Sequence, residues 1–396
     1  MSLPFPPPIP QMLAKSVGEG VPAPDSVPGG LRYDPKWDGF RVLIFHDTTD
    51  EGSSVVLQGR YSTRSRSAKD LAYAFPEVVS AVTQLVPPGS VVDGELVIAR
   101  NGRLHFDDLG MRLRPRSEEG GWKIRELSQD FPASVVAFDL LAVGGQDFRG
   151  LADRERRSAL EGLLDGVPAP IHLSPTTTDQ DTAREWFHLF EGAGLDGVIA
   201  RSLASAYMEG KRTLLKVKHK RSADVVVAGW RPHKNPGPEG QPVVGSLLLG
   251  LYDNDGQLHH VGVASSFTAE RRIGLLQEIA PVALDDPSDH PWAEWARQEQ
   301  LGSASPSPTR PPAAGPAAQR MPGAPSRWSG GKDLSWIPLR PDLVAEVGYD
   351  HMQGNRFRHV AHFQRWRPDR SSDTCAYAQL DRPVRFDLDD VLSGGL

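Results

Sequence analysis

The sequence has very little cysteine and no long apolar run. Its 396 residues include a single cysteine, Cys375, which excludes an internal disulfide and any zinc site built from several thiolates. No stretch of about 18 apolar residues occurs, so no membrane-spanning helix is expected. The N-terminus, with its proline run at residues 6–8, lacks the basic and then apolar layout of a signal peptide. These absences predict a cytoplasmic protein without a membrane partner.

The composition is that of a globular protein with more than one domain. Hydrophobic residues make up 39% and charged residues 24% of the chain, as in ordinary folded proteins. A chain of this length can form two or three domains with separate cores. The net charge of -6 excludes a surface coated uniformly for nucleic acid, but positive charge concentrates at residues 201–234 and 356–370. Such clusters indicate either solvated charged faces or phosphate contacts confined to particular faces.

The first part of the chain predicts an α+β fold. Residues 1–30 are rich in proline and glycine and indicate an extended lead-in, in which only residues 11–16 could form a helical turn. β-Branched and aromatic runs predict strands at residues 40–45, 54–57, 90–98 and 133–141. Helical apolar spacing predicts helices at residues 77–85 and 182–193. Strands that follow each other closely require a largely antiparallel sheet.

The second part predicts a small β-barrel. A boundary is expected near residues 218–223, after which short strands are predicted at residues 225–230, 243–252, 257–264, 343–349 and 357–366. A hairpin is expected at residues 253–256 and a helix at residues 268–279. Several short strands with one helix are typical of a Greek-key barrel of the oligonucleotide-binding (OB) type. Residues 302–327, dominated by Pro, Ala, Ser and Gly, predict a disordered insertion in it.

The most informative stretch, from Tyr33 to Arg41, places Lys36 between apolar residues at the head of a predicted strand. An amine that attacks phosphorus needs an environment that disfavours its protonated form, which burial or neighbouring cations provide. Trp37 and Phe40 could supply the burial, and the later basic clusters could supply the cations. The K-x-D-G string is short enough to occur by chance, so its meaning depends on the motifs downstream of it.

Five further signals follow Lys36 in order. They are Ser65-Arg66 ahead of Phe75-Pro76-Glu77, Asp93-Gly94-Glu95 in a strand, Phe138 in an apolar run, Asp196-Gly197 ahead of a strand, and Lys216-Val217-Lys218. Because residues two apart on a strand share a face, Lys216 and Lys218 can both point at one phosphate.

These residue types are the ones that nucleotidyl transfer to a lysine requires. Attack on the α-phosphorus of a nucleoside triphosphate builds negative charge on the non-bridging oxygens and on the departing pyrophosphate. Acids that bind a divalent metal, together with fixed cations, neutralise that charge. An aromatic ring offers a platform for the base. The sequence therefore predicts an enzyme that works through a covalent nucleotidyl-lysine.

In this order the motifs resemble those of ATP-dependent DNA ligases. The resemblance is greatest to the short bacterial ligases, which have an adenylation domain and an OB domain and no N-terminal DNA-binding domain. It implies a nucleotidyltransferase domain with ATP-grasp-like mixed sheets over residues 31–220, followed by an OB-fold barrel over residues 221–396. It also implies sealing of nicked double-stranded DNA by a monomer in the bacterial cytoplasm, associated with the nucleoid. ATP would donate AMP, Mg²⁺ or Mn²⁺ would be the metal, and DNA end-joining or repair proteins would be partners.

The resemblance also implies a role for each motif residue. Lys36 would be the adenylated nucleophile. Asp34 would lie beside the adenine, and Phe138 would stack on it. Glu95 would hold the ribose or the metal, Asp196 would bind the metal, and Lys216 and Lys218 would hold the α-phosphate. Arg41 and Arg66 would contact the AMP ribose or the 5′-phosphate of the nick. In the last segment, Arg367 and Arg370 would orient the pyrophosphate leaving group.

Some choices stay open at this point. Asp34 and Asp196 stand where the family usually has glutamate, one methylene longer, and Arg60 or Arg64 could take the role of Arg66. The sugar preferred at the nick, the metal and the repair pathway are also open. An RNA ligase or an mRNA-capping guanylyltransferase would use the same chemistry, and a nucleic-acid-binding scaffold would need only the barrel.

Overall fold

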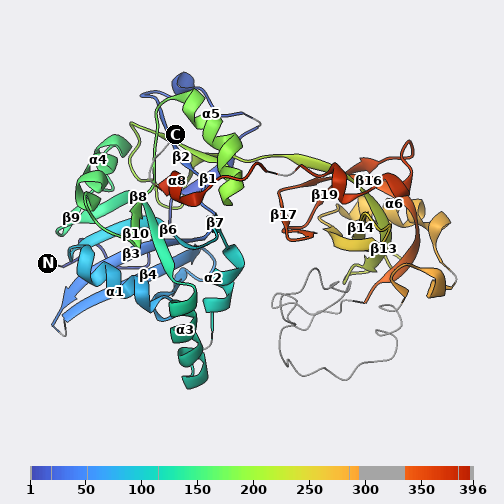
Figure 1. Cartoon of the computed structure of the whole chain (residues 1–396), viewed down its shortest axis with the longest axis horizontal. Helices are drawn as coiled ribbons and strands as arrows, with labels where there is room; N and C mark the ends of the chain where they lie inside the picture. The colour runs from blue at the N-terminus through green and yellow to red at the C-terminus, as the bar shows by residue number, and fades with distance from the viewer. Residues whose placement is uncertain are drawn as a thin grey trace. The chain divides into compact units, whose positions relative to one another are not determined.

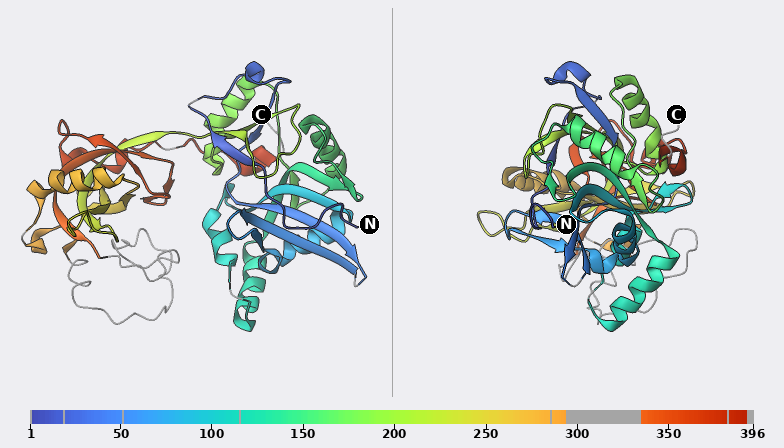
Figure 2. Two further views of the ribbon diagram at one scale, coloured as in Figure 1. Left: turned by 180° about the vertical axis from the view of Figure 1, so that it is seen from behind. Right: turned by 90° about the vertical axis from the view of Figure 1, so that its left-hand side faces the viewer.

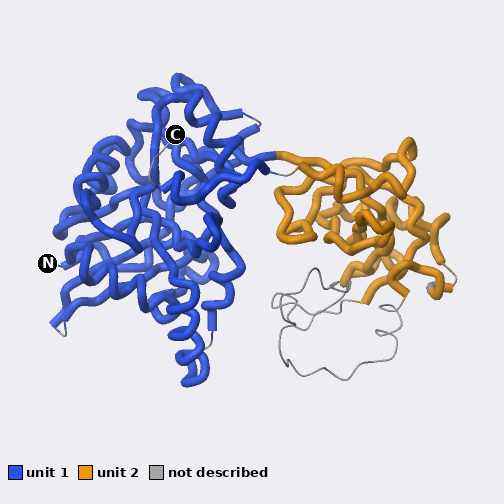
Figure 3. The backbone as a smooth tube through the Cα atoms, in the orientation of Figure 1, with its two compact units in different colours: residues 1–219, 383–396 blue, residues 220–382 orange. Residues whose placement is uncertain are grey.

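The computed structural model describes residues 2–18, 20–50, 52–114, 116–284, 286–293, 335–381 and 383–392. The chain divides into two compact units, Met1–His219 with Pro383–Leu396, and Lys220–Arg382 (Figure 3). The insertion predicted at residues 302–327 lies outside the described residues. No helix in the described ranges has the length and apolar character that crossing a lipid bilayer requires.

Two sheets form the first unit (Figures 1 and 2). The larger contains β3 Phe40–Thr49, β4 Gly52–Ser62, β5 Ser67–Asp70, β6 Ser90–Arg100, β8 Ala133–Val143 and β10 Ile171–Leu173, in the order β10-β8-β6-β3-β4-β5. The short strands β7 Arg103–Leu104 and β9 Gln146–Asp147 pair with β6 and β8. The smaller sheet contains β1 Leu13–Ser16, β2 Leu31–Pro35, β11 Val198–Ser202 and β12 Arg212–Val217, in the order β1-β12-β11-β2. The strands predicted in this part of the sequence are present.

Helices cover these sheets. The larger sheet is contacted by α1 Pro76–Leu85, α2 Phe106–Arg112 and α4 Asp153–Leu164, and α3 Glu118–Asp130 packs on α1. The smaller sheet is contacted by α5 Gln180–Leu189, which continues into the 3₁₀ turn η3 Phe190–Ala193. Further 3₁₀ turns are η1 Pro24–Ser26 and η2 Ala72–Ala74. The predicted helix at residues 77–85 is confirmed, whereas that at residues 182–193 starts earlier, because Asp179 caps it by accepting from the Thr182 N–H at 2.7 Å.

The larger sheet is buried on both faces, which explains the nearly continuous apolar run of β3. Val42 and Ile44 belong to the core beneath the helices. Leu43 and Phe45 point to the opposite face, where they pack with Met12 of the N-terminal segment. Alternate residues of a strand face opposite ways, so covering both faces requires apolar residues at every position.

The N-terminal segment forms a strand, and the helical turn predicted within residues 11–16 is wrong. β1 pairs in parallel with β12, and the Leu13 N–H donates to the Lys211 carbonyl at 2.7 Å. Met12 is 1% exposed. Hydrogen bonds to the sheet edge and burial of Met12 outweigh the weak local helix preference of a short segment.

The second unit is a curled antiparallel sheet with one longer helix in its described part. β13 Arg221–Pro232, β14 Val244–Tyr252, β15 Leu258–Ala264, β16 Ile337–Tyr349 and β19 His362–Trp366 lie in the order β15-β14-β13-β16-β19. The other elements are the hairpin of β17 Met352–Gln353 and β18 Arg356–Phe357, the helix α6 Ala269–Ile279, and the 3₁₀ turns η4 Ala280–Val282, η5 Pro287–Asp289, η6 Ser372–Thr374 and η7 Tyr377–Gln379. The Ala361 N–H donates to the Val263 carbonyl at 2.9 Å. This bond joins β15 to the chain before β19 and closes the sheet into the expected OB barrel.

Local signals account for most of this barrel. The predicted hairpin forms at Asp253, whose Oδ1 accepts from the Gln257 N–H at 2.8 Å, and Thr268 caps α6 through the Arg271 N–H at 3.2 Å. The single strand predicted over residues 357–366 is wrong, because a turn between β18 and β19 divides it.

The last described segment returns to the first unit, which corrects the prediction that residues 221–396 form one domain. Leu388 and Val391 of α8 Leu388–Leu392 are each 1% exposed and share a core cluster with Trp186 and Phe190. Figures 1 and 2 both show α8 among the elements of the first unit. Burial of these apolar side chains beside η3 gives the segment its place. The chain therefore passes between the units twice.

Replacing Gly192 with alanine is expected to displace this segment. A Cβ at Gly192 would lie 2.6 Å from the Phe386 nitrogen and closer still to the Val384 carbonyl, so overpacking should lower Tm by about 3 °C or more. A Cβ added at Gly162 in α4 would have open space within 4 Å, and Gly162→Ala should leave Tm equal or slightly higher. Thermal unfolding of both variants checks this, and equal midpoints would contradict it.

Candidate active site

Lys36 lies where the chain passes from β2 in the smaller sheet to β3 in the larger. Its main chain extends the pairing of β2 with β11, because its N–H donates to the Gly197 carbonyl at 2.8 Å and its carbonyl accepts from the Asp196 N–H at 2.9 Å. This pairing sets Lys36 opposite Asp196. Lys36 Nζ is 2.5 Å from Asp196 Oδ2, so two predicted motifs meet 160 residues apart in sequence.

Gly39 explains why the lysine motif ends in glycine. Its N–H donates to Glu95 Oε1 at 3.2 Å. A Cβ at Gly39 would lie 2.9 Å from the Glu95 Cγ and closer still to the Leu96 carbonyl. Only a residue without a side chain allows β3 to begin this close to β6. The motif therefore brings Lys36 and Glu95 to the same site.

Positive charge exceeds negative charge around Lys36. Lys218 Nζ lies 2.8 Å from Asp196 Oδ2, the same oxygen that Lys36 contacts. Burial opposes ionisation of Asp196, but Lys36 and Lys218 outweigh it and hold the pKa of that carboxyl at about 2. Burial, then Lys218 and Lys36, lower the pKa of Lys216. Lys36 and Lys218 share the Asp196 carboxylate, and Lys216 lies near enough for their charges to lower its pKa, an arrangement suited to binding phosphate.

The pKa of Glu95 is shifted in the opposite direction. It lies directly across from Arg41 in the β3–β6 ladder. Burial raises the pKa of Glu95 to about 8, although Lys36 and Arg41 both favour its ionised form. The two predicted metal-binding acids therefore differ in protonation at neutral pH.

Phe138 of β8 faces the same site. Its ring is 6% exposed, and the guanidinium carbons of Arg41 and Arg201 lie 5.6 and 4.8 Å from its centroid. A π surface that attracts guanidinium groups can equally stack on a flat base. Its role as the adenine platform stays a prediction.

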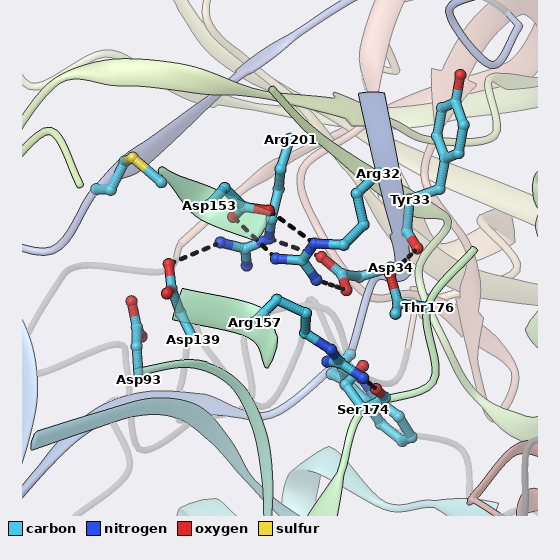
Figure 4. A network of polar contacts seen from close by, with 12 residues as sticks. Arg32, Tyr33, Asp34, Asp93, Asp139, Asp153, Arg157, Ser174, Thr176 and Arg201 are labelled. Atoms are coloured by element: carbon cyan, nitrogen blue, oxygen red, sulfur yellow. Dashed lines mark hydrogen bonds and ion pairs between the residues drawn. The ribbon is translucent and has the colours of Figure 1, made fainter. Parts of the chain in front are cut away.

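Asp34 lies in a buried ion network (Figure 4). It is 2% exposed. Its Oδ1 accepts from Arg32 Nη1 at 2.6 Å, and its Oδ2 accepts from Arg201 Nε at 2.6 Å. Both carboxylate oxygens are thus held by arginines, and the predicted contact of Asp34 with adenine stays untested.

The network extends across the unit. Arg32 also holds both oxygens of Asp153 at 2.8 and 2.9 Å, and Arg156 holds both oxygens of Asp139 at 2.8 and 3.0 Å. No sequence motif predicted these residues, and Arg201 was predicted only as part of a basic cluster. Asp139 offered one signal, since an acid inside a buried apolar strand needs a cationic partner.

The three alternative arginines lie on the surface of the first unit. Arg66 has φ 51°, within the turn that joins β4 to β5, and Arg60, Arg64 and Arg66 are all exposed. The structure favours none of them, so the assignment of Arg66 stays a prediction.

The predicted pyrophosphate-binding arginines belong to the second unit. Arg367 Nη1 lies 2.9 Å from Asp224 Oδ1, and Nη2 lies 2.8 Å from Asp369 Oδ2. Arg370 Nε lies 3.2 Å from Asp224 Oδ2. The hydrogen bond from Arg367 lowers the pKa of Asp369 to about 2. Acids thus fix the orientation of both arginines, while their role in catalysis stays a prediction.

The acids of the site fit a metal ion that enters with phosphate. Within the described residues, no three His, Cys, Asp or Glu side chains gather as a metal-binding group. Mg²⁺ is commonly held by one or two carboxylates together with substrate phosphates. Glu95 and Asp196 supply such a pair beside the lysine cluster.

Comparison with known proteins identifies this architecture as a nucleotidyltransferase domain with an OB barrel. The family model described as the ATP dependent DNA ligase domain matches residues 11–218, and the ATP dependent DNA ligase C terminal region matches residues 240–370. The chain therefore belongs to the ATP-dependent DNA ligase family. It is an enzyme that uses ATP to join DNA, as its motifs predicted.

Curated relatives agree with this assignment. DNA ligase C2 of Mycolicibacterium smegmatis is 45% identical over 383 residues, which cover 97% of each chain. DNA ligase C of Mycobacterium tuberculosis is 44% identical over 400 residues, covering 100% of this chain and 99% of the relative. The multifunctional non-homologous end joining DNA repair protein LigD of Mycobacterium tuberculosis is 29% identical over 263 residues, covering 65% of this chain and 30% of LigD.

Removal of one network arginine should destabilise the first unit strongly. Arg32→Ala leaves Asp34 and Asp153 short of a cation in a buried site, which should cost about 3–5 kcal/mol. Arg184, 52% exposed in its pair with Asp181, is the matched control, and Arg184→Ala should cost less than about 1 kcal/mol. Urea unfolding followed by fluorescence measures both. A small loss for Arg32→Ala would mean that the network contributes little to stability.

Proposed function

We propose that this ligase carries AMP on Lys36. Once Lys36 has released a proton to solvent, the Nζ lone pair attacks the α-phosphorus of ATP. A phosphorus–nitrogen bond forms as Nζ loses a second proton to solvent, and the bond to the oxygen that bridges the α- and β-phosphates breaks. Pyrophosphate leaves with that electron pair. The observation that supports this role is the contact of Lys36 with an ionised Asp196, beside Lys218 and Lys216.

The neighbours of Lys36 have separable tasks. The pKa of Asp196 is about 2, so its carboxylate is too weak a base to hold a proton released by Lys36. Asp196 instead orients Nζ. Lys216 and Lys218 bind the α-phosphate, and Phe138 stacks on the adenine. Mg²⁺ or Mn²⁺, held by Glu95 and Asp196, would neutralise part of the charge on the triphosphate.

Two transfers follow on the DNA. The AMP moves from Lys36 to the 5′-phosphate of a nick, which breaks the phosphorus–nitrogen bond and frees the lysine. The adjacent 3′-hydroxyl then attacks the 5′-phosphate, and AMP leaves as the strand is joined. Arg41 and Arg66 contact the AMP ribose or the 5′-phosphate, where cations stabilise charge in the transition state.

The setting of the reaction is also part of the proposal. The enzyme acts as a monomer on the nucleoid in the bacterial cytoplasm, where its DNA substrate lies. We propose DNA end-joining or repair proteins as partners, and the similarity to LigD over part of the chain supports this class of partner.

Replacing Lys36 with alanine should abolish the covalent intermediate. Wild-type protein incubated with α-labelled ATP and Mg²⁺ or Mn²⁺ should gain an acid-labile label, and a chelator should prevent it. Lys36→Ala should gain none, since the attacking nitrogen is gone. Lys123→Ala, which alters a surface lysine paired with Glu126, is the control and should label normally. Labelling by GTP without labelling by ATP would instead indicate a capping enzyme.

Replacing Arg367 should affect one step only. Without its charge on the departing pyrophosphate, Arg367→Ala should form lysyl-AMP about 10- to 100-fold more slowly, yet seal a nick that is already adenylated at a normal rate. Arg340→Ala, which removes an exposed arginine paired with Asp342, is the control. Single-turnover assays of the two steps separate the outcomes, and equal losses in both steps would refute the assignment.

A further inference from the structure

We propose that Tyr207 and the main chain of Met12 are positioning groups for Arg41, and that the DNA ligase reaction depends on them through that arginine. The inference rests on the proposed role of Arg41 at the nucleotide or the nick. Its basis is a set of hydrogen bonds that joins four distant parts of the first unit.

All three nitrogens of the Arg41 guanidinium form hydrogen bonds. Nε lies 3.0 Å from Asp93 Oδ1 and Nη2 lies 2.7 Å from Asp93 Oδ2, a two-pronged pairing that fixes the guanidinium plane. Nη1 donates to the Met12 carbonyl at 2.5 Å. The second N–H groups of Nη1 and Nη2 remain for an oxygen of ribose or phosphate.

Tyr207 joins the two partners of Arg41. Its hydroxyl donates to Asp93 Oδ2 at 2.9 Å and accepts from the Met12 N–H at 3.1 Å. Tyr207, Asp93 and Met12 are 5%, 0% and 1% exposed. Burial and the neighbouring Asp93 raise the pKa of Tyr207 well above its ordinary value, so the hydroxyl keeps its proton and its role as donor.

Met12 is itself pinned to the chain around Tyr207. The Met208 N–H donates to Met12 Sδ at 3.4 Å, and the Gly210 N–H donates to the Gln11 carbonyl at 3.2 Å. The N-terminal strand and the segment before β12 therefore hold each other. Together these two segments fix the position of the Met12 carbonyl. Because this acceptor belongs to the main chain, a substitution of the Met12 side chain would not remove it.

These hydrogen bonds matter because Arg41 is the most exposed member of the group. Its side chain is 24% exposed, and an arginine loses much rotamer entropy when it is ordered. Fixed partners order it before the substrate arrives, so the cost does not fall on the transition state. Tyr207 contacts neither Lys36 nor Phe138 through any of these bonds, which defines it as a positioning residue and not a catalytic one.

A double-mutant cycle tests the inference on the full chain. Tyr207→Phe, Arg41→Ala and the double variant are compared for lysyl-AMP formation and for sealing of a nick that is already adenylated. We expect Tyr207→Phe to slow the step that Arg41→Ala slows by about 10-fold or more. In the Arg41→Ala background, Tyr207→Phe should cause no further loss of rate, although its effect on Tm should persist.

Controls separate positioning from general damage. Tyr33 is 0% exposed and its hydroxyl donates to the Pro22 carbonyl at 2.6 Å, so Tyr33→Phe removes a comparable buried phenol contact and should leave the rates unchanged. Asp93→Asn, which keeps the shape of the side chain but replaces an acceptor oxygen, provides a second variant for the same cycle and should show the same dependence on Arg41.

Three results would overturn the inference: equal rate losses from Tyr207→Phe in both backgrounds, no loss in the wild-type background, or no effect of Arg41→Ala on either step. None of these affects the loss of labelling in Lys36→Ala, so failure of the inference is distinguishable from failure of the proposed mechanism.

Discussion

The first unit depends on a network of buried charges of alternating sign, which links β2, β8, β11 and α4. Asp34, Asp139 and Asp153 are each compensated by arginines within hydrogen-bonding distance or ion-pair distance, and unpaired charges at this depth would be very costly. Because the partners come from different elements, the network sets those elements relative to one another. β2 leads directly into Lys36, and β8 carries Phe138, so the network also sets the positions of this lysine and this aromatic ring.

The same unit gives two carboxylates opposite properties. Asp196 is kept ionised by two ammonium groups, whereas Glu95 is driven toward its neutral form by burial. A cation that arrives with the triphosphate would favour ionised Glu95, since opposite charge lowers the pKa of a carboxyl. With Glu95 largely neutral, the lysines beside Asp196 give this part of the unit a surplus of positive charge, which attracts phosphate.

The sequence was most informative where the controlling interactions are local. The hairpin at Asp253 and the cap at Thr268 follow from neighbouring residues. Lys36, Asp196 and Lys218 belong to three of the ordered motifs, and the structure brings both lysines into contact with Asp196. The sequence was least informative where distant segments decide. β1 forms because it pairs with the edge strand β12. α8 packs on the first unit because it covers the apolar side chains of Trp186 and Phe190. Asp34 pairs with Arg201, which lies 167 residues away in the sequence. Neither periodicity nor motif spacing in a sequence indicates such contacts. The buried ion network and the hydrogen bonds to Arg41 are therefore visible only in the structure.

The return of α8 makes the second unit, in topological terms, an insertion within the first. A stop codon after residue 219 would not release an intact first unit, because Trp186 and Phe190 would lose the cover that Leu388 and Val391 provide, and freshly bared apolar surface promotes aggregation. Excising the barrel would instead require a linker that rejoins residue 219 to residue 383. A protein fused after α8 would likewise be attached to the unit that contains Lys36, and not to the barrel.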